Sequence, residues 1–478
     1  MAMDDQLIAR MAAQVLAKLQ DHDAAGRESP GLFADLDDAV AAARQAYRQL
    51  KTLSRDSREA IIRAVREAAY GNAALLSGLA VQETGMGRVA DKIIKNELAA
   101  QKTPGTEILY TEACSGDRGL TIVERGPYGV IGAITPTTNP SATIINNCIG
   151  MIAAGNAVVF SPHPSAVRTS CKTLAIINEA IVKAGGPENL LTAVARPSIE
   201  TAGRLMKHPD INMLVATGGP AVVSAVLSSG KKAIGAGAGN PPAVVDQTAD
   251  IAKAARDIVA GCSFDNNLPC IAEKEVIAVG SIADELMAYM RKAGAYQLSG
   301  RQTEELAKVV LTEKQAEAAA GCSYRPTKIY AANKAFIGKD AGYILRHIGI
   351  EDGDAAKVIL CETEADHPFV LEELMMPVLP LVQVKDVDAA IRLAVEVEHG
   401  NRHTAIMHSK NVDNMTRLAR AIETTVFVKN GPSFAGIGVG GEGFTTFTIA
   451  GPTGEGLTSA KSFARQRRCV LVDAFSIV

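Results

Sequence analysis

Short apolar segments alternate with helix-like segments between residues 130 and 242, and this alternation constrains the fold more than any other feature of the chain. The apolar segments are rich in Val, Ile and Ala and are soon followed by Gly or Pro, which is typical of buried strands. They cover residues 130–135, 157–160, 192–195, 213–216 and 232–234. Strands that alternate with helices form βαβ units around a parallel sheet, so we predict an α/β fold with a Rossmann-like nucleotide-binding domain.

The alternation returns between residues 242 and 434, which predicts a second α/β region. From Asp35 to Lys102 the spacing of apolar residues is helical almost throughout. The predicted strands outside the first region are residues 120–125, 276–279, 358–361, 378–384, 426–429 and 468–478, and the predicted helices of the second region are 282–293 and 387–398.

Composition excludes several classes of partner. The chain has 478 residues and a formal net charge of −3, so it lacks the basic field that binds nucleic acid or an anionic membrane. Apolar runs are interrupted by Gly, Pro or Asn before they reach membrane-spanning length, and the N-terminus does not resemble a signal peptide. The eight cysteines form no CxxC or zinc-finger spacing, so we expect no metal site and a reducing, intracellular compartment.

Residues 3–20 form a small unit of their own, with apolar residues at helical spacing opposite charged ones. Residues 21–31 read as a linker of His, Asp, Gly, Ser and Pro. A tethered amphipathic helix has to bury its apolar stripe. It could dock on a partner, or pack back on its own domain or oligomer, and the pattern favours neither.

Three turns follow predicted strands of the first region, at residues 135–137, 161–163 and 217–219. Parallel sheets bind ligands at the carboxyl ends of their strands, and a glycine pair that opens a helix suits a pyrophosphate. Ordinary connections between strands and helices are the alternative. Residues 436–441 fit G-x-G-x-x-G after a strand, but no helical pattern follows. We therefore reject this motif as the dinucleotide site and predict a Gly-rich loop near the active-site mouth.

Cys270 comes directly after Leu268 and Pro269, and the turn-forming residues Asp265, Asn266 and Asn267 precede this pair. This pattern predicts a stiff loop that presents one thiol ahead of a buried strand. Taken alone, a cysteine is more often a buried structural residue than a nucleophile, because only an activated thiolate is reactive.

Together these pieces resemble the aldehyde dehydrogenase superfamily, from about Leu32 to the C-terminus. The resemblance rests on Thr-Pro-Thr-Thr-Asn-Pro at residues 135–140, on the Cys270 loop, and on Glu-Leu-Met-Met-Pro-Val at residues 373–378, which is similar to the family's Glu-Ile-Phe-Gly-Pro-Val signature. It implies a Rossmann-type NAD domain, a second α/β catalytic domain, a β oligomerisation flap, and a homo-oligomer, either a dimer or a tetramer. The implied segments are an NAD domain at 32–109 and 128–241, a flap at 110–127 and 460–478, and a catalytic domain at 242–459.

The resemblance also implies residue roles. Cys270 would attack the aldehyde, and the Asn139 side-chain amide with the Cys270 backbone N–H would hold the developing oxyanion. Glu373 would bind the nicotinamide ribose. His163 stands where the family usually has a lysine, so it would contact the cofactor or CoA, or else be an exposed loop histidine. The remaining cofactor-lining residues would be Thr135, Pro136, Thr137, Thr217, Gly218 and Gly219.

One departure from the family indicates the subclass. The glutamate that activates water in hydrolysing members aligns with Ala236, which is 34 residues before Cys270 (270 − 236). Alanine cannot act as a general base, so a better nucleophile than water has to take the acyl group from the cysteine. Residues 83–88, 264–270 and 402–405 resemble the CoA-acylating propionaldehyde and acetaldehyde branch of bacterial microcompartments. The resemblance thus implies that a short aldehyde, NAD+ and CoA give acyl-CoA and NADH.

That branch often carries an N-terminal amphipathic helix that targets the enzyme to the shell lumen. The resemblance therefore implies a targeting helix at residues 1–20 and a cytoplasmic protein inside a microcompartment. Two alternatives stay open at this point: a hydrolysing dehydrogenase whose base is another residue, such as Glu372, and a non-catalytic nucleotide-binding protein associated with a shell.

Overall fold

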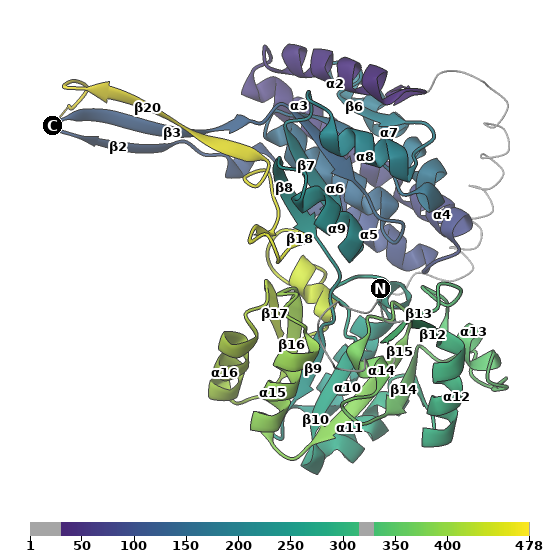
Figure 1. Ribbon diagram of the computed structural model, residues 1–478. Coiled ribbons are helices and arrows are strands. Elements are labelled where there is room, and N and C mark those ends of the chain that lie inside the picture. The colour runs from purple at the N-terminus through teal and green to yellow at the C-terminus, as the bar shows by residue number, and fades with distance from the viewer. Residues whose placement is uncertain (1–29, 315–328, 478) are drawn as a thin grey trace, which may run out of the picture. The chain divides into compact units, whose positions relative to one another are not determined.

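The computed structural model describes residues 30–314 and 329–477 (Figure 1). The predicted helix at residues 3–20 and nearly all of the predicted linker lie outside these residues. No helix in the described part of the chain is long and apolar enough to span a bilayer.

Contacts divide the chain into two compact units, each with its own core. The first unit contains the described residues up to Thr84, then residues 92–237 and 443–477. The second unit contains residues 85–91 and 238–442. The predicted domain bounds differ from these units at residues 85–91, 238–241 and 443–459, each of which belongs to the other unit than predicted.

The described residues of the first unit contain a six-stranded parallel sheet in the order β1-β6-β5-β4-β7-β8. Its strands are β1 (Leu32–Phe33), β4 (Val130–Ile134), β5 (Ala157–Ser161), β6 (Leu191–Val194), β7 (Met213–Thr217) and β8 (Lys232–Ala236). The five predicted strands are confirmed as β4 to β8, and their apolar side chains are buried on both sheet faces, as parallel sheets require. Strand β1 was not predicted because it has only two residues.

Helices cover this sheet, and α6 is the one that positions candidate site residues. All of its residues are buried, and it begins at Pro140, where the missing N–H of proline costs no hydrogen bond. The helices of the unit are α2 (Leu36–Leu50), α3 (Arg55–Gly71), α4 (Ala73–Thr84), α5 (Val89–Lys102), α6 (Pro140–Ala153), α7 (Val167–Lys183), α8 (Ile199–Lys207) and α9 (Pro220–Leu227). The first three residues of α5 belong to the second unit.

A separate three-stranded antiparallel sheet forms an arm of the first unit (Figure 1). Strand β3 (Gly119–Pro127) lies between β2 (Glu112–Gly116) and β20 (Ala464–Val472), and β3 pairs with β20 over nine residues. Strand β20, at one edge of this sheet, exposes apolar side chains, including Val470 and Val472. The predicted role of this arm in joining protomers stays a prediction.

The described residues of the second unit contain a seven-stranded parallel sheet in the order β11-β14-β15-β10-β9-β16-β17. The α/β class is thereby confirmed for both units. The strands are β9 (Pro242–Val245), β10 (Glu275–Val279), β11 (Ala295–Gln297), β14 (Val358–Glu362), β15 (Val378–Val384), β16 (Thr404–His408) and β17 (Val426–Lys429). The helices are α10 (Ile251–Ser263), α11 (Gly280–Lys292), α12 (Gly300–Val310), α13 (Ala341–Arg346), α14 (Pro368–Leu371), α15 (Val387–Val397) and α16 (Val412–Ile422).

Two short ladders complete the described structure: β12 (Leu311–Lys314) with β13 (Ile329–Ala332) in the second unit, and β18 (Ile449–Ala450) with β19 (Gly456–Leu457) in the first. The segment after β17 continues as a 3-10 turn (Ser433–Ile437) and then as loop, with no α-helix. The predicted lack of a helix after the glycine motif at residues 436–441, which is the reason for rejecting it as a dinucleotide fingerprint, is therefore confirmed.

Candidate active site

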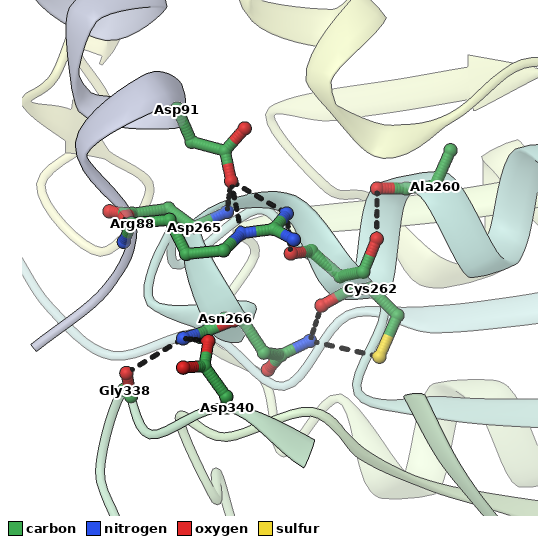
Figure 2. Close-up of polar contacts among 10 residues, drawn as sticks. Arg88, Asp91, Ala260, Cys262, Asp265, Asn266, Gly338 and Asp340 are labelled. Atoms are coloured by element: carbon green, nitrogen blue, oxygen red, sulfur yellow. Dashed lines mark hydrogen bonds and ion pairs between the residues drawn. The ribbon is translucent and has the colours of Figure 1, made fainter. Parts of the chain in front are cut away.

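The loop before Cys270 has an unusual backbone. Three successive residues, Asp265, Asn266 and Asn267, have φ values of 47°, 54° and 64°. The left-handed region is costly for residues with a Cβ, and Asp and Asn tolerate it best because their short polar side chains can bond locally. Three such residues in a row persist only if the surrounding structure holds them, and Figure 2 shows the contacts that do so.

Asp265 is held from segment 85–91. Its carboxylate accepts a hydrogen bond from the Arg88 backbone N–H at 2.8 Å, and its own N–H donates to the Asp91 carboxylate at 2.9 Å. The Arg88 guanidinium bonds the same Asp91 oxygen and the Ser263 carbonyl (Figure 2). A Cβ on Gly87 would lie 2.1 Å from the Asp265 carboxylate, so this approach requires glycine. These bonds explain why residues 85–91 pack with the second unit.

Asn266 and Asn267 are held by further side-chain amide bonds. The Asn266 amide donates to the Gly338 carbonyl at 3.0 Å and to the Asp340 carboxylate at 2.9 Å (Figure 2). The Asn267 amide donates to the Cys262 carbonyl at 3.1 Å. Asn266, Asn267, Gly338 and Cys262 are buried, whereas Asp340 is exposed. A buried hydrogen bond that is lost leaves an unsatisfied polar atom. The loop is therefore fixed before any substrate arrives.

A buried lysine closes the other side of the loop. The Lys274 ammonium donates to the Asn267 carbonyl at 2.9 Å and to the Asn267 side-chain oxygen at 2.7 Å. It also lies 3.8 Å from the Glu373 carboxylate, whose side chain is 16% exposed. Burial raises the pKa of Glu373, while Lys274 and the Gly239 N–H oppose that rise. This cation thus links the cysteine loop to the glutamate expected to bind the ribose.

Cys270 is half-buried, and no disulfide joins the described cysteines. The other described cysteines of the second unit, Cys262 and Cys361, are fully buried, and burial raises the pKa of both thiols, that of Cys361 to about 12. Such thiols stay protonated and unreactive. Within the described part of this unit, Cys270 is therefore the cysteine that a reactant can reach.

A histidine absent from the predicted site also belongs to this region. A Cβ on Gly239 would lie 2.7 Å from the Cys270 carbonyl oxygen and 3.0 Å from the His403 ring, so these groups pack closely around Gly239. His403 is buried, and burial lowers its pKa to about 4, so the imidazole is neutral. Its Nε2 has no hydrogen-bond partner among the described residues. Sequence reasoning noted residues 402–405 only as a family motif, because a lone histidine after a turn carries no positional signal.

The other candidate residues lie in the first unit, around the turn between β4 and α6. Asn139 precedes Pro140 as the N-cap residue of α6. Thr135 is buried, and its N–H donates to the Ser161 carbonyl at 3.2 Å. The hydroxyls of Thr135 and Thr137 have no hydrogen-bond partner within the described residues. Buried unpaired hydroxyls at a strand end are suited to a polar ligand.

The three predicted ligand loops do come together in the first unit. Strands β5, β4 and β7 are neighbours in the sheet, so the loops after them share its carboxyl edge. Gly219 precedes α9 without a side-chain cap, which leaves the helix N–H groups available to a phosphate. These features fit a dinucleotide. The cofactor roles of the predicted residues stay predictions: Thr135, Pro136, Thr137, Thr217, Gly218 and Gly219.

Two residues that were predicted to contact the cofactor, Thr217 and His163, already make hydrogen bonds within the protein. The Thr217 hydroxyl is 2.8 Å from the Thr448 hydroxyl, so binding a ligand would require this pair to open or be shared. The exposed His163 ring accepts a hydrogen bond from the Ser165 N–H at 3.1 Å and thereby caps its own turn. Ala236 ends strand β8 as a buried methyl group and offers no base.

Comparisons with known proteins agree with this chemistry. The model of the aldehyde dehydrogenase family matches residues 21–447. The acetaldehyde dehydrogenase (acetylating) EutE of Salmonella typhimurium is 51% identical over the full length of both chains. The crystal structure of Rhodopseudomonas palustris propionaldehyde dehydrogenase, with bound CoA and an acylated cysteine, is 55% identical, with a TM-score of 0.89 over 94% of this chain and 99% of that one.

A second solved structure is equally similar in fold. The propionaldehyde dehydrogenase from the Clostridium phytofermentans fucose utilisation bacterial microcompartment is 53% identical, with a TM-score of 0.89 over 94% of this chain and all of that one. The family model covers well over half of the sequence, and the relatives match the chain from end to end or nearly so. The chain belongs to the aldehyde dehydrogenase family.

Proposed function

We propose that this protein is a CoA-acylating aldehyde dehydrogenase that converts a short aldehyde, NAD+ and CoA to acyl-CoA and NADH. The observation that carries the proposal is the 55% identity to a propionaldehyde dehydrogenase whose structure holds CoA and an acylated cysteine. Ala236, at the end of β8, supports it from this chain's own residues, because a methyl group cannot activate water.

In the proposed reaction, the Cys270 sulfur adds to the aldehyde carbon and the carbonyl oxygen becomes an oxyanion. The Asn139 side-chain amide and the Cys270 N–H donate hydrogen bonds to that oxygen. A nicotinamide dinucleotide, when bound, accepts the hydride that leaves the same carbon. The product is a thioester on Cys270. The CoA thiol, after losing its proton, attacks the thioester carbon and releases Cys270 as a thiolate.

The proposal also assigns residues to the dinucleotide. The loops after β4, β5 and β7 hold the dinucleotide, and Thr135 and Thr137 offer their unpaired hydroxyls. Glu373 holds the nicotinamide ribose, and Lys274, 3.8 Å away, opposes the rise that burial causes in the pKa of that carboxyl. Each of these roles can be tested by substituting a single residue.

Omitting CoA tests the proposed function. With propionaldehyde and NAD+ but no CoA, we expect a burst of about one NADH per Cys270, followed by turnover about 100-fold slower than with CoA, because water is a poor nucleophile without a base. Stopped-flow absorbance at 340 nm measures both phases. Desulfo-CoA, which keeps the nucleotide and lacks the thiol, is the matched control. Steady NADH formation at the full rate without CoA, with free acid as product, would establish the hydrolysing alternative.

We also propose that the protein associates with a bacterial microcompartment. Support comes from the Clostridium phytofermentans structure, which belongs to such a compartment, and from the amphipathic pattern of residues 3–20. Residues 1–20 fused to a fluorescent protein should form puncta in cells that make a matching shell. Diffuse fluorescence, with puncta from a known targeting peptide in the same cells, would count against this.

A further inference from the structure

We propose that Lys95 is a positioning residue for the oxyanion donor Asn139, an inference that rests on the proposed function of Asn139. Lys95 lies in α5, within the first unit, and its side chain is only 1% exposed. Its ammonium donates a hydrogen bond to the side-chain oxygen of Asn139, which stands at the start of α6. A buried ammonium thus contacts the one side chain of this unit that is assigned to the reacting oxygen.

The contact fixes which way the Asn139 amide faces. A lysine ammonium carries donors only, so its partner has to be the amide oxygen. The NH2 group of Asn139 then points away from Lys95. Among the described residues it donates one long hydrogen bond, 3.3 Å to the Thr138 hydroxyl, and an amide nitrogen has two hydrogens to donate. One of them therefore stays available for an oxyanion.

Asn139 gives up its usual structural role in this arrangement. Asparagine is among the best N-cap residues because its oxygen can accept from the first helix N–H groups. Here Asn139 is the N-cap residue of α6, yet its side chain makes no capping hydrogen bond. Lys95 has taken the oxygen that would cap the helix. A side chain withdrawn from capping and held by a buried cation is oriented for another purpose.

The cation also strengthens the donor. Burying an ammonium is costly, and a leucine or methionine would fill the same space without that cost. In a low-dielectric interior, the positive Lys95 ammonium bound to the amide oxygen polarises the amide group. The N–H bonds of its NH2 then become stronger donors. Such a donor gains most when charge develops on the substrate oxygen. Loss of Lys95 should therefore lower kcat and leave the aldehyde KM nearly unchanged.

A double-mutant cycle tests this inference through CoA-dependent NADH formation from propionaldehyde. Asn139→Ala should lower kcat by about 10²–10³-fold, and Lys95→Met by about 10–100-fold, with aldehyde KM within about 3-fold of wild type. Because Lys95 acts through Asn139, the double variant should be no more than about 3-fold slower than Asn139→Ala alone. A double variant that loses the product of both effects would show that Lys95 acts independently, and would overturn the inference.

Two controls separate positioning from folding. Lys92 lies one turn earlier in α5, is 4% exposed, and donates to the Thr138 backbone carbonyl at 3.0 Å. Lys92→Met should destabilise the protein about as much as Lys95→Met but lower kcat less than about 10-fold. Its effect on kcat should add to that of Asn139→Ala. Lys95→Arg, which keeps the charge and the donors, should retain more activity than Lys95→Met, and it replaces that variant in the cycle if methionine prevents folding. An equal loss from Lys92→Met and Lys95→Met would contradict the inference.

The outcomes also distinguish this inference from the function on which it rests. Full activity of Asn139→Ala would remove the oxyanion role, and with it the basis for Lys95. A large loss in Asn139→Ala with no loss in Lys95→Met would leave the proposed function standing and overturn only the role of Lys95.

Discussion

Replacing Cys270 with alanine is expected to lower CoA-dependent NADH formation from propionaldehyde by about 10⁴-fold or more, because the sulfur forms the bond on which both later steps depend. The variant should keep its stability within about 1 kcal/mol, since Cys270 is half-buried at the end of a loop that other residues hold. Steady-state and burst kinetics measure the loss, and urea unfolding measures the stability.

Cys361→Ala is the matched control for this change. Cys361 lies in β14 and is fully buried, with a pKa raised to about 12, so its thiol is inert. Its replacement should cost about 1 kcal/mol of stability through lost packing and leave kcat within about 3-fold. If Cys270→Ala oxidised the aldehyde at the wild-type rate, Cys270 would not be the nucleophile. An equal loss in both variants would point to damaged folding instead.

The expected size of that loss reflects a thiol that is held in place in advance. Three left-handed residues turn the chain before Cys270. Asp265 and Asn266 are fixed by bonds to distant parts of the second unit, and Asn267 by bonds to residues near it in sequence. A side chain held within a fraction of an ångström needs little ordering when the substrate binds. The loop sequence alone predicts the turn and the presented thiol. It cannot predict Arg88 or Asp340 as anchors, because contacts between residues far apart in sequence leave no local pattern.

The same limit explains which parts of the fold could be predicted. Strands β4 to β8 were predicted because each is a short apolar run that ends near Gly or Pro, and burial on both faces demands such runs. Strand β9 was missed because it begins at Pro242, directly after a Gly-rich turn, and β16 because it begins and ends with the polar residues Thr404 and His408. Pairing partners on both sides decide these strands, whatever their local propensity.

The buried lysines are the clearest case of tertiary context overriding composition. Lysine is almost always exposed, so a helical pattern assigns Lys95 to the solvent face and a loop pattern gives Lys274 no role. The structure places both among buried residues, with Lys95 on Asn139 and Lys274 on Asn267 and Glu373. Each lysine contacts a residue that carries the proposed chemistry. Such cations can be found only once the fold brings their partners together.

Lys274→Met is accordingly expected to destabilise the second unit by about 3–5 kcal/mol, the typical cost of removing one partner from a buried, hydrogen-bonded charge. The change leaves the Asn267 carbonyl and side-chain oxygen without their donor and the Glu373 carboxylate without its cation. Urea unfolding monitored by circular dichroism measures this loss. Lys253→Met is the control, because Lys253 pairs with Asp257 while its own side chain is 43% exposed, and it should cost less than about 1 kcal/mol.

The destabilisation caused by Lys274→Met, measured as the decrease in the free energy of unfolding, should also grow as the pH rises from about 5 to about 8. Burial raises the folded-state pKa of Glu373, and Lys274 opposes that rise, so the variant's pKa lies higher still. A carboxyl whose pKa is higher in the folded than in the unfolded protein binds its proton more tightly in the folded state. The free energy of unfolding therefore falls as the pH rises above the pKa of the unfolded state. Adding Glu373→Gln, which cannot ionise, should weaken the trend and leave the part due to Glu275, whose raised pKa Lys274 also opposes. A destabilisation that is equal at both pH values would show that Lys274 stabilises the loop through Asn267 and not through these carboxyls.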